Sequence, residues 1–141
     1  DALLVLLGNN VCIKTSWINK SIRMLKNNSN INSIVPAVID QDHHPYRAKR
    51  LKNNGFLETY FNFKEHKVSS NRQSLPKNLF LSHNFWLIRL TKNKLPNNGQ
   101  YPWNFLGKNV KPFIINSSVD IHEKEDLSKS KVWLEENKIK I

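Results

Sequence analysis

The sequence has too little cysteine and too few long apolar runs for a disulfide-stabilised or membrane-spanning protein. Cys12 is the one cysteine among 141 residues, so no disulfide can form within the chain. The longest uninterrupted apolar run, residues 2–7, is far shorter than the ~20 residues that a transmembrane helix needs. We therefore expect a single cytoplasmic domain with no membrane partner, stabilised by burial of apolar side chains.

Glycine is also scarce. The chain has four glycines, and they are isolated from one another at positions 8, 55, 99 and 107. A loop that cradles nucleotide phosphates needs closely spaced glycines, because backbone N–H groups must approach the phosphates. The 141 residues therefore contain no glycine-rich phosphate loop.

Acidic residues are few relative to basic ones. The chain holds 22 Lys and Arg against 11 Asp and Glu, which gives a formal net charge of +11. The excess lies in residues 1–119, because the last 22 residues hold six acids and five bases. A basic surface raises the local concentration of anions, and nucleic acid, nucleotide phosphates and carboxylated sugars all remain open as partners.

The apolar pattern predicts an α/β fold. Residues 2–7 are expected to form a fully buried strand, and residues 33–39 a second one. Between them Ile18, Ile22 and Leu25 are spaced to form the apolar side of a helix. A strand, a helix and a strand in this order form a βαβ unit, with both strands parallel in one sheet.

The middle of the chain is polar, aromatic and basic. Within residues 40–76, the turn signal Asn53-Asn54-Gly55 predicts a hairpin. Further strands are expected over residues 84–90 and 110–115. A terminal helix is expected to begin near the acids of residues 123–126, which would complement its macrodipole.

Four side chains are candidates for ligand binding. Asp120 and His122 project to the same side of an extended segment and could share a metal ion, although an acid before a helix also serves as a cap. Arg72, in a polar loop, could hold a carboxylate or phosphate through two hydrogen bonds, and it could equally be a solvated surface residue. The same alternatives apply to Arg47, which belongs to a basic strip.

Four segments, taken in order, resemble the acylneuraminate cytidylyltransferases, or CMP-sialic acid synthetases. They read ALLVLLGNNVCIKTSWINKSIRML, DHHPYRAKRL, SSNRQSLPKNLFLSHNFWLI and VDIHEKEDLSKS, and they span nearly all of the chain. The resemblance implies a transferase reaction in which an acidic sugar attacks CTP, with Mg²⁺, to give a CMP-sugar and pyrophosphate. The implied fold is a partial nucleotidyltransferase, Rossmann-like with a mostly parallel sheet, in which residues 40–76 form an inserted hairpin that joins a homodimer.

Carried over position by position, the resemblance also implies site residues. Asp120 would bind the metal ion, and His122 stands where the family has a second aspartate. Arg47 and Arg72 would face the sugar acid. Lys14, in the turn after the first strand, is the third implied substrate-binding residue.

The family's glycine-rich nucleotide loop would precede the first residue of this chain. We therefore expect the 141 residues to be a partial cytidylyltransferase that is inactive alone. The second interpretation of the sequence is a non-catalytic dimerisation or sugar-acid-binding module. A basic nucleic-acid-binding domain is the third, and nucleic acid is the least favoured partner.

Overall fold

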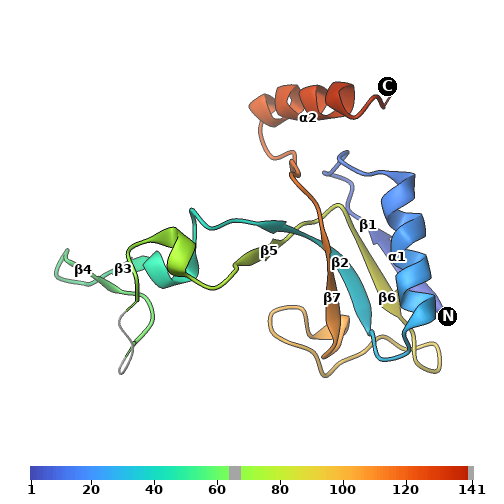
Figure 1. Ribbon diagram of the computed structural model, residues 1–141, viewed down its shortest axis with the longest axis horizontal. Coiled ribbons are helices and arrows are strands. Elements are labelled where there is room, and N and C mark those ends of the chain that lie inside the picture. The colour runs from blue at the N-terminus through green and yellow to red at the C-terminus, as the bar shows by residue number, and fades with distance from the viewer. Residues whose placement is uncertain (64–67, 140–141) are drawn as a thin grey trace. The chain divides into compact units, whose positions relative to one another are not determined.

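A computed structural model describes residues 1–63 and 68–139 (Figure 1). Its helices and strands are β1 (Ala2–Leu6), α1 (Thr15–Asn27), β2 (Ser33–Ile39), β3 (Lys49–Leu51), β4 (Leu57–Thr59), β5 (Leu79–Leu81), β6 (Phe85–Arg89), β7 (Val110–Ile114) and α2 (Lys124–Glu136). The chain divides into two compact units: unit 1 comprises Asp1–Val38 and Leu81–Ile141, and unit 2 comprises Ile39–Phe80. Across the described ranges, neither helix has the length and apolar character to cross a membrane.

Five strands form one mixed sheet. β6 lies between β1 and β2 and is antiparallel to both, whereas β7 pairs with β2 in parallel. β1, β2 and β7 therefore run in the same direction. The predicted α/β class, with the first two strands parallel in one sheet, is confirmed. The sheet is nevertheless mixed rather than mostly parallel, because β6 enters between those two strands in the opposite direction.

β1 is not the fully buried strand that its composition predicts. Leu3, Leu4 and Leu6 are 39%, 36% and 56% exposed. Among the described residues β1 pairs with β6 alone, so it is an edge strand. An apolar run shows that a strand can be buried, but its burial depends on neighbours supplied by distant parts of the chain.

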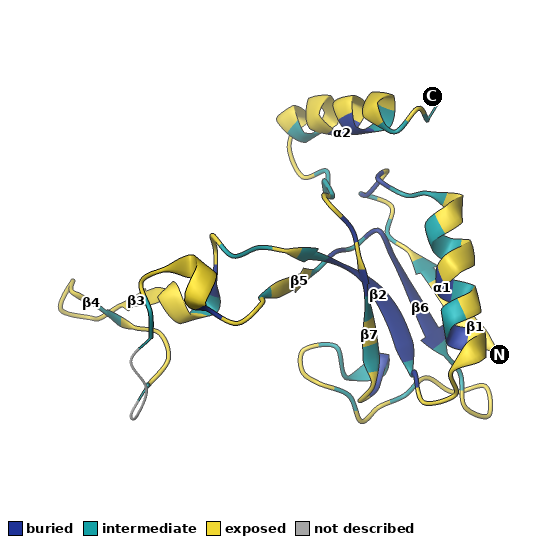
Figure 2. Ribbon diagram, viewed as in Figure 1, coloured by how far each residue is buried: buried dark blue, intermediate teal, exposed yellow. Residues whose placement is uncertain are grey.

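The sheet is buried on both faces at its centre, and Figure 2 shows β2 and β6 as its most buried strands. Successive residues of a strand point to opposite faces. Ile34 and Leu87 accordingly pack on one face with Leu25 of α1, as the predicted apolar side of this helix requires. Val35 and Trp86 pack on the other face.

Unit 2 contains the predicted hairpin. β3 and β4 are antiparallel, with Leu51 opposite Leu57. Gly55 in the connecting turn has a φ of +83°, a left-handed conformation that glycine adopts without steric cost. Beside the hairpin, the Tyr46 ring packs edge-on against Phe63 at 5.1 Å between ring centres.

Helix α2 begins with capping hydrogen bonds around one carboxylate. The backbone N–H groups of His122 and Glu123 each donate to Asp126 Oδ2 at 3.1 Å, and the Lys129 ammonium donates to Oδ1 at 3.1 Å. These bonds hold the pKa of the Asp126 carboxyl below its usual value. Their contribution to stability is therefore present above the unfolded-state pKa and is lost as the pH falls through the lowered one.

We expect Asp126→Asn to lower the melting temperature by a few degrees at neutral pH, because an amide is the weaker acceptor for these N–H groups. The difference from wild type should shrink as the pH falls from about 5 toward 2, where the wild-type carboxyl becomes protonated. Thermal unfolding followed by circular dichroism measures both. Glu125→Gln, in the same turn, is the control and should have a smaller effect; a pH-independent difference for Asp126→Asn would contradict the argument.

Candidate functional site

Polar side chains gather in unit 1 along the edge of the sheet where the strands end, rather than along an edge strand. β1, β2 and β7 end at this edge, and β6 begins there because it is antiparallel to its neighbours. In open α/β sheets, ligands bind outside the carboxyl ends of the strands. The segments that follow β1 and β7 and precede β6 supply five side chains, which we call the polar cluster: Asn10, His83, Asn84, Ser118 and Asp120.

Asp120 is held from two sides within the polar cluster. Asn10 Nδ2 donates to Asp120 Oδ1 at 2.6 Å, and His83 Nδ1 lies 3.2 Å from Oδ2. The backbone of Asn10 also forms a bridge with that of Asp120, next to a hydrogen bond from Ile121 N–H to Asn9 O at 2.8 Å. The Asp120 side chain is still 25% exposed. Its carboxylate is therefore fixed in place and accessible to a ligand.

Asn84 connects two loops of the polar cluster from the buried side. Its side chain is fully buried at the start of β6. Asn84 Nδ2 lies 2.6 Å from the Cys12 carbonyl oxygen, 2.9 Å from Ser118 Oγ and 3.1 Å from Asn10 Oδ1. These acceptors belong to the loop after β1 and to the loop after β7. The buried Asn84 amide therefore fixes the relative positions of the two loops, because an acceptor that moved away would remain buried without a hydrogen-bond donor.

Cys12 lies behind the polar cluster and is fully buried. Its thiol donates to the Val119 carbonyl oxygen at 4.0 Å. Burial raises the pKa of the Cys12 thiol above its usual value, and the negative charge of Asp120 acts in the same direction. A thiol that stays protonated at neutral pH is a poor nucleophile, so Cys12 has a packing role.

His83, rather than His122, is the histidine that contacts Asp120. The His83 ring packs edge-on against Trp86 at 5.6 Å and Trp103 at 6.1 Å between ring centres, which orients Nδ1 toward the carboxylate. His122 is exposed, and its backbone N–H caps α2. Over residues 1–63 and 68–139, no three His, Cys, Asp or Glu side chains are grouped to hold a metal ion. A metal ion shared by Asp120 and His122 stays a prediction.

Lys14 lies elsewhere in unit 1. It is the N-cap residue of α1, and its ammonium nitrogen is 5.4 Å from the ring centre of Trp17 and 5.7 Å from that of Trp133. Both distances are within the range of cation–π attraction. The implied substrate-binding role of Lys14 stays a prediction.

Unit 2 holds Arg47 and Arg72 on either side of one acidic residue. Arg72 Nη1 forms an ion pair with Asp42 Oδ1, and Arg47 Nη1 donates to the Asp42 carbonyl oxygen at 3.4 Å. The side chains of Arg72 and Asp42 are 56% and 65% exposed. Exposed ion pairs contribute only about 0–1 kcal/mol, so a ligand carboxylate could replace Asp42 on Arg72 at little cost.

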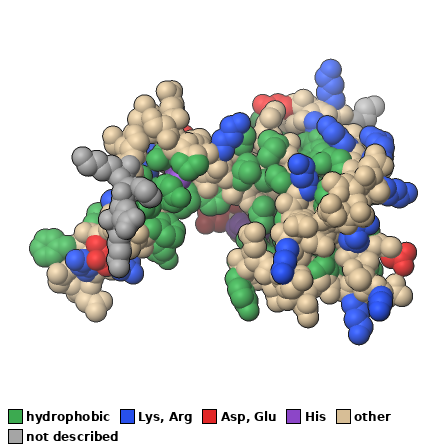
Figure 3. Space-filling view, turned by 60° about the horizontal axis from the view of Figure 1, so that its bottom comes forward, with side chains coloured by type: hydrophobic (Ala, Val, Ile, Leu, Met, Phe, Trp, Pro, Cys, Tyr) green, Lys and Arg blue, Asp and Glu red, His purple; other side chains and the backbone are tan. Residues whose placement is uncertain are grey.

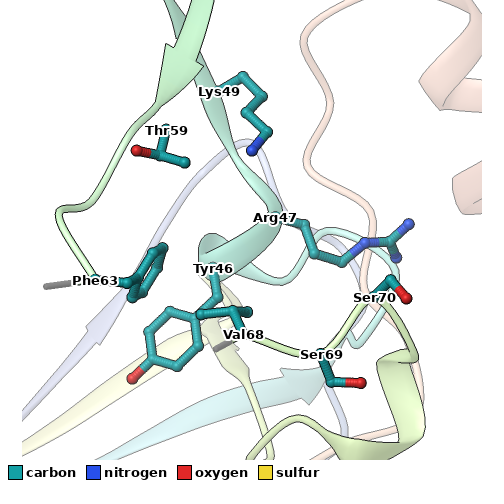
Figure 4. A pocket seen from close by; sticks show the side chains of 8 residues that line it. All are labelled: Tyr46, Arg47, Lys49, Thr59, Phe63, Val68, Ser69 and Ser70. Carbon is teal, nitrogen blue, oxygen red and sulfur yellow. The ribbon is translucent and has the colours of Figure 1, made fainter. Parts of the chain in front are cut away.

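A pocket of about 450 Å³ lies beside Arg47 in unit 2. Figure 4 shows the rings of Tyr46 and Phe63 close together on its wall, with the Arg47 guanidinium directed away from them. Lys49 adds a second positive charge to the lining. The pocket therefore combines an aromatic wall with basic groups, which suits an anionic ligand with an apolar face.

Asn10, Asn84 and Ser118 are site residues that the sequence analysis did not identify. A usable signal was present, because Asn10 and Ser118 each lie three residues after a predicted strand and Asn84 is the first residue of another. What was missing was the direction of β6, which brings Asn84 to the same edge as the other two.

Comparison with models of known protein families gave no match, and neither did comparison with curated proteins.

We expect Asn84→Ala to lower the free energy of unfolding by about 3 kcal/mol, because buried acceptors on two loops lose a donor. Urea denaturation followed by tryptophan fluorescence measures the change. Asn97→Ala, in an exposed loop, is the matched control and should change the free energy by less than about 0.5 kcal/mol. Equal effects of the two substitutions would show that Asn84 does not hold the loops.

Proposed function

We propose that this chain is part of a cytidylyltransferase of the acylneuraminate type, which joins an acidic sugar to CTP. In this reaction the sugar hydroxyl loses its proton and its oxygen attacks the α-phosphorus of CTP. The bond from the α-phosphorus to the oxygen bridging the β-phosphate breaks, and pyrophosphate leaves. The products are a CMP-sugar and pyrophosphate, so a phosphoanhydride bond of CTP is exchanged for a phosphate ester bond to the sugar.

The place of Asp120 carries the proposal. The resemblance assigns a metal-binding role to this residue from its motif alone, without reference to the fold. Independently, Asp120 lies at the carboxyl edge of the sheet, where open α/β folds bind their ligands. Asn10 and His83 hold its carboxylate there in one orientation. Such a fixed carboxylate is what a phosphoryl-transfer site needs.

The Asp120 carboxylate itself fits a magnesium ion. Mg²⁺ is usually held by one or two carboxylates and completes its shell with water and substrate phosphates. A carboxylate oxygen can accept two hydrogen bonds, so each Asp120 oxygen keeps a free lone pair beside its present contact. Asp120 would hold the ion, which when bound offsets the negative charge of the triphosphate.

Other charged residues support binding of two anionic substrates. The net charge of +11 favours the approach of both CTP and a sugar carboxylate. On the face shown in Figure 3, the Lys and Arg side chains are scattered rather than gathered into one stripe, which supports small anions over a nucleic acid. In unit 2, Arg72 and Arg47 would bind the sugar carboxylate in place of Asp42.

The hairpin of unit 2 supports a homodimer. Leu51, Phe56 and Leu57 are 71%, 70% and 69% exposed on and beside β3 and β4. An isolated two-stranded hairpin is marginally stable, and neighbouring exposed apolar side chains mark interaction sites. A second copy of the chain is the partner that the resemblance implies for this surface.

We expect Asp120→Asn to reduce CTP-dependent pyrophosphate release about a hundredfold or more. The assay uses the product of the complete coding sequence that contains these residues, with Mg²⁺, CTP and N-acetylneuraminate. Glu125→Gln, a charge loss at an exposed helix position, is the control and should keep full activity. Absence of pyrophosphate release from the wild-type product with a panel of sugar acids would refute the proposed reaction.

We expect Leu57→Glu to convert a dimer to a monomer, because it places a charge in the apolar surface of the hairpin. Size-exclusion chromatography with light scattering measures the mass of the same complete product. Leu95→Glu is the control, since Leu95 is exposed in unit 1 and should leave the dimer intact. A wild-type product that is monomeric at about 100 μM would exclude this interface as a stable one.

A further inference from the structure

Unit 1 contains a cavity of about 460 Å³ whose lining includes no residue of the polar cluster. It lies where the first turn of α1, the segment after β7 and the last turn of α2 meet. Its walls include Lys14, Trp17, Asn116, Ser117, Trp133 and Glu136. Its volume is within the ~300–1,000 Å³ typical of small-molecule sites.

Two opposite charges face this cavity without neutralising each other. Lys14 and Glu136 both line it, and among the described residues neither forms an ion pair with the other or with any third residue. A purely anionic ligand would be attracted to Lys14 but repelled by Glu136, and a cation would meet the reverse. A ligand that carries both charges would satisfy both side chains.

The surroundings of Lys14 favour a carboxylate at that end. The two indole rings hold the Lys14 ammonium at 5.4 Å and 5.7 Å. The first turn of α1 contains no acidic residue, and its N-cap makes no side-chain hydrogen bond, so the positive end of the helix dipole adds to the charge of Lys14. The two rings therefore position the cation, and no acidic residue in the first turn of α1 opposes it.

The tryptophans supply an apolar wall. Trp17 and Trp133 pack edge-on with 5.9 Å between ring centres, and Trp133 is 6% exposed. Because Trp133 is almost wholly buried, the apolar surface that this pair offers to a ligand comes mainly from the half-buried Trp17. Asn116 and Ser117 add an amide and a hydroxyl that can bond to polar atoms of a ligand.

We propose that this cavity binds a small zwitterion of the α-amino acid class with an apolar side chain. The ligand carboxylate pairs with Lys14, its ammonium pairs with Glu136, and its side chain packs against Trp17. The inference uses neither Asp120 nor the nucleotide, and it assigns Lys14 to this ligand rather than to the sugar or CTP.

Three related probes separate the charges of such a ligand. The product of the complete coding sequence is titrated with L-leucine, with N-acetyl-L-leucine, which keeps only the carboxylate, and with L-leucinamide, which keeps only the ammonium. Calorimetry gives the affinity, and the indole N–H signals of Trp17 and Trp133 report the place of binding. We expect saturable binding of L-leucine and at least about tenfold weaker binding of each derivative. Equal binding of N-acetyl-L-leucine, or no saturation by L-leucine up to about 10 mM, would overturn the proposal.

Variants test the two charges separately. Lys14→Met and Glu136→Gln should each weaken L-leucine binding about tenfold or more. Lys108→Met and Glu135→Gln, which make the same changes at exposed positions outside the cavity lining, are the controls and should bind as wild type does. Because Glu136 is exposed, its substitution leaves the fold intact, so unchanged binding by Glu136→Gln alone would overturn the proposal.

Discussion

Unit 1 depends on the pairing of β2 along both of its edges. β7 pairs with one edge from Ser33 to Ala37, while β6 pairs with the other at Ser33 and Ile34. A strand with neighbours on both sides satisfies its backbone hydrogen bonds away from water, so its side chains can be buried on both faces. Ile34, Val35 and Ala37 are accordingly inaccessible to solvent, and both core clusters include a residue of this strand.

The position of the polar cluster follows from this arrangement. β1 and β7 run in the direction of β2, so the segments after both strands emerge at one edge and bring Asn10 close to Asp120. β6 runs the other way, so the residues that precede it arrive at the same edge. His83 orients the carboxylate at the surface, and Asn84 fixes the loops below it.

Local patterns predicted the elements of the fold well and its long-range pairing poorly. The apolar, β-branched run at residues 33–39 predicted the bounds of β2, and the turn at Gly55 predicted the hairpin. The predicted full burial of β1 was wrong because, among the described residues, β1 has a neighbour on one side alone, β6, which comes from far along the chain. For the same reason, the spacing of Asp120 and His122 suggested a pair, whereas the contact of Asp120 with His83 depends on the direction of β6.

The register of β1 on β6 has a consequence for the order in which the protein can fold during synthesis. Ala2 pairs with Arg89, so β1 leaves the ribosome long before its partner exists. β6 is synthesised only after the whole of unit 2. Pairings of such high sequence separation form slowly, because the intervening chain must be ordered or looped out first. The leucines of β1 therefore stay in water throughout that interval, and this is the stage at which a nascent chain is most exposed to aggregation and to chaperones.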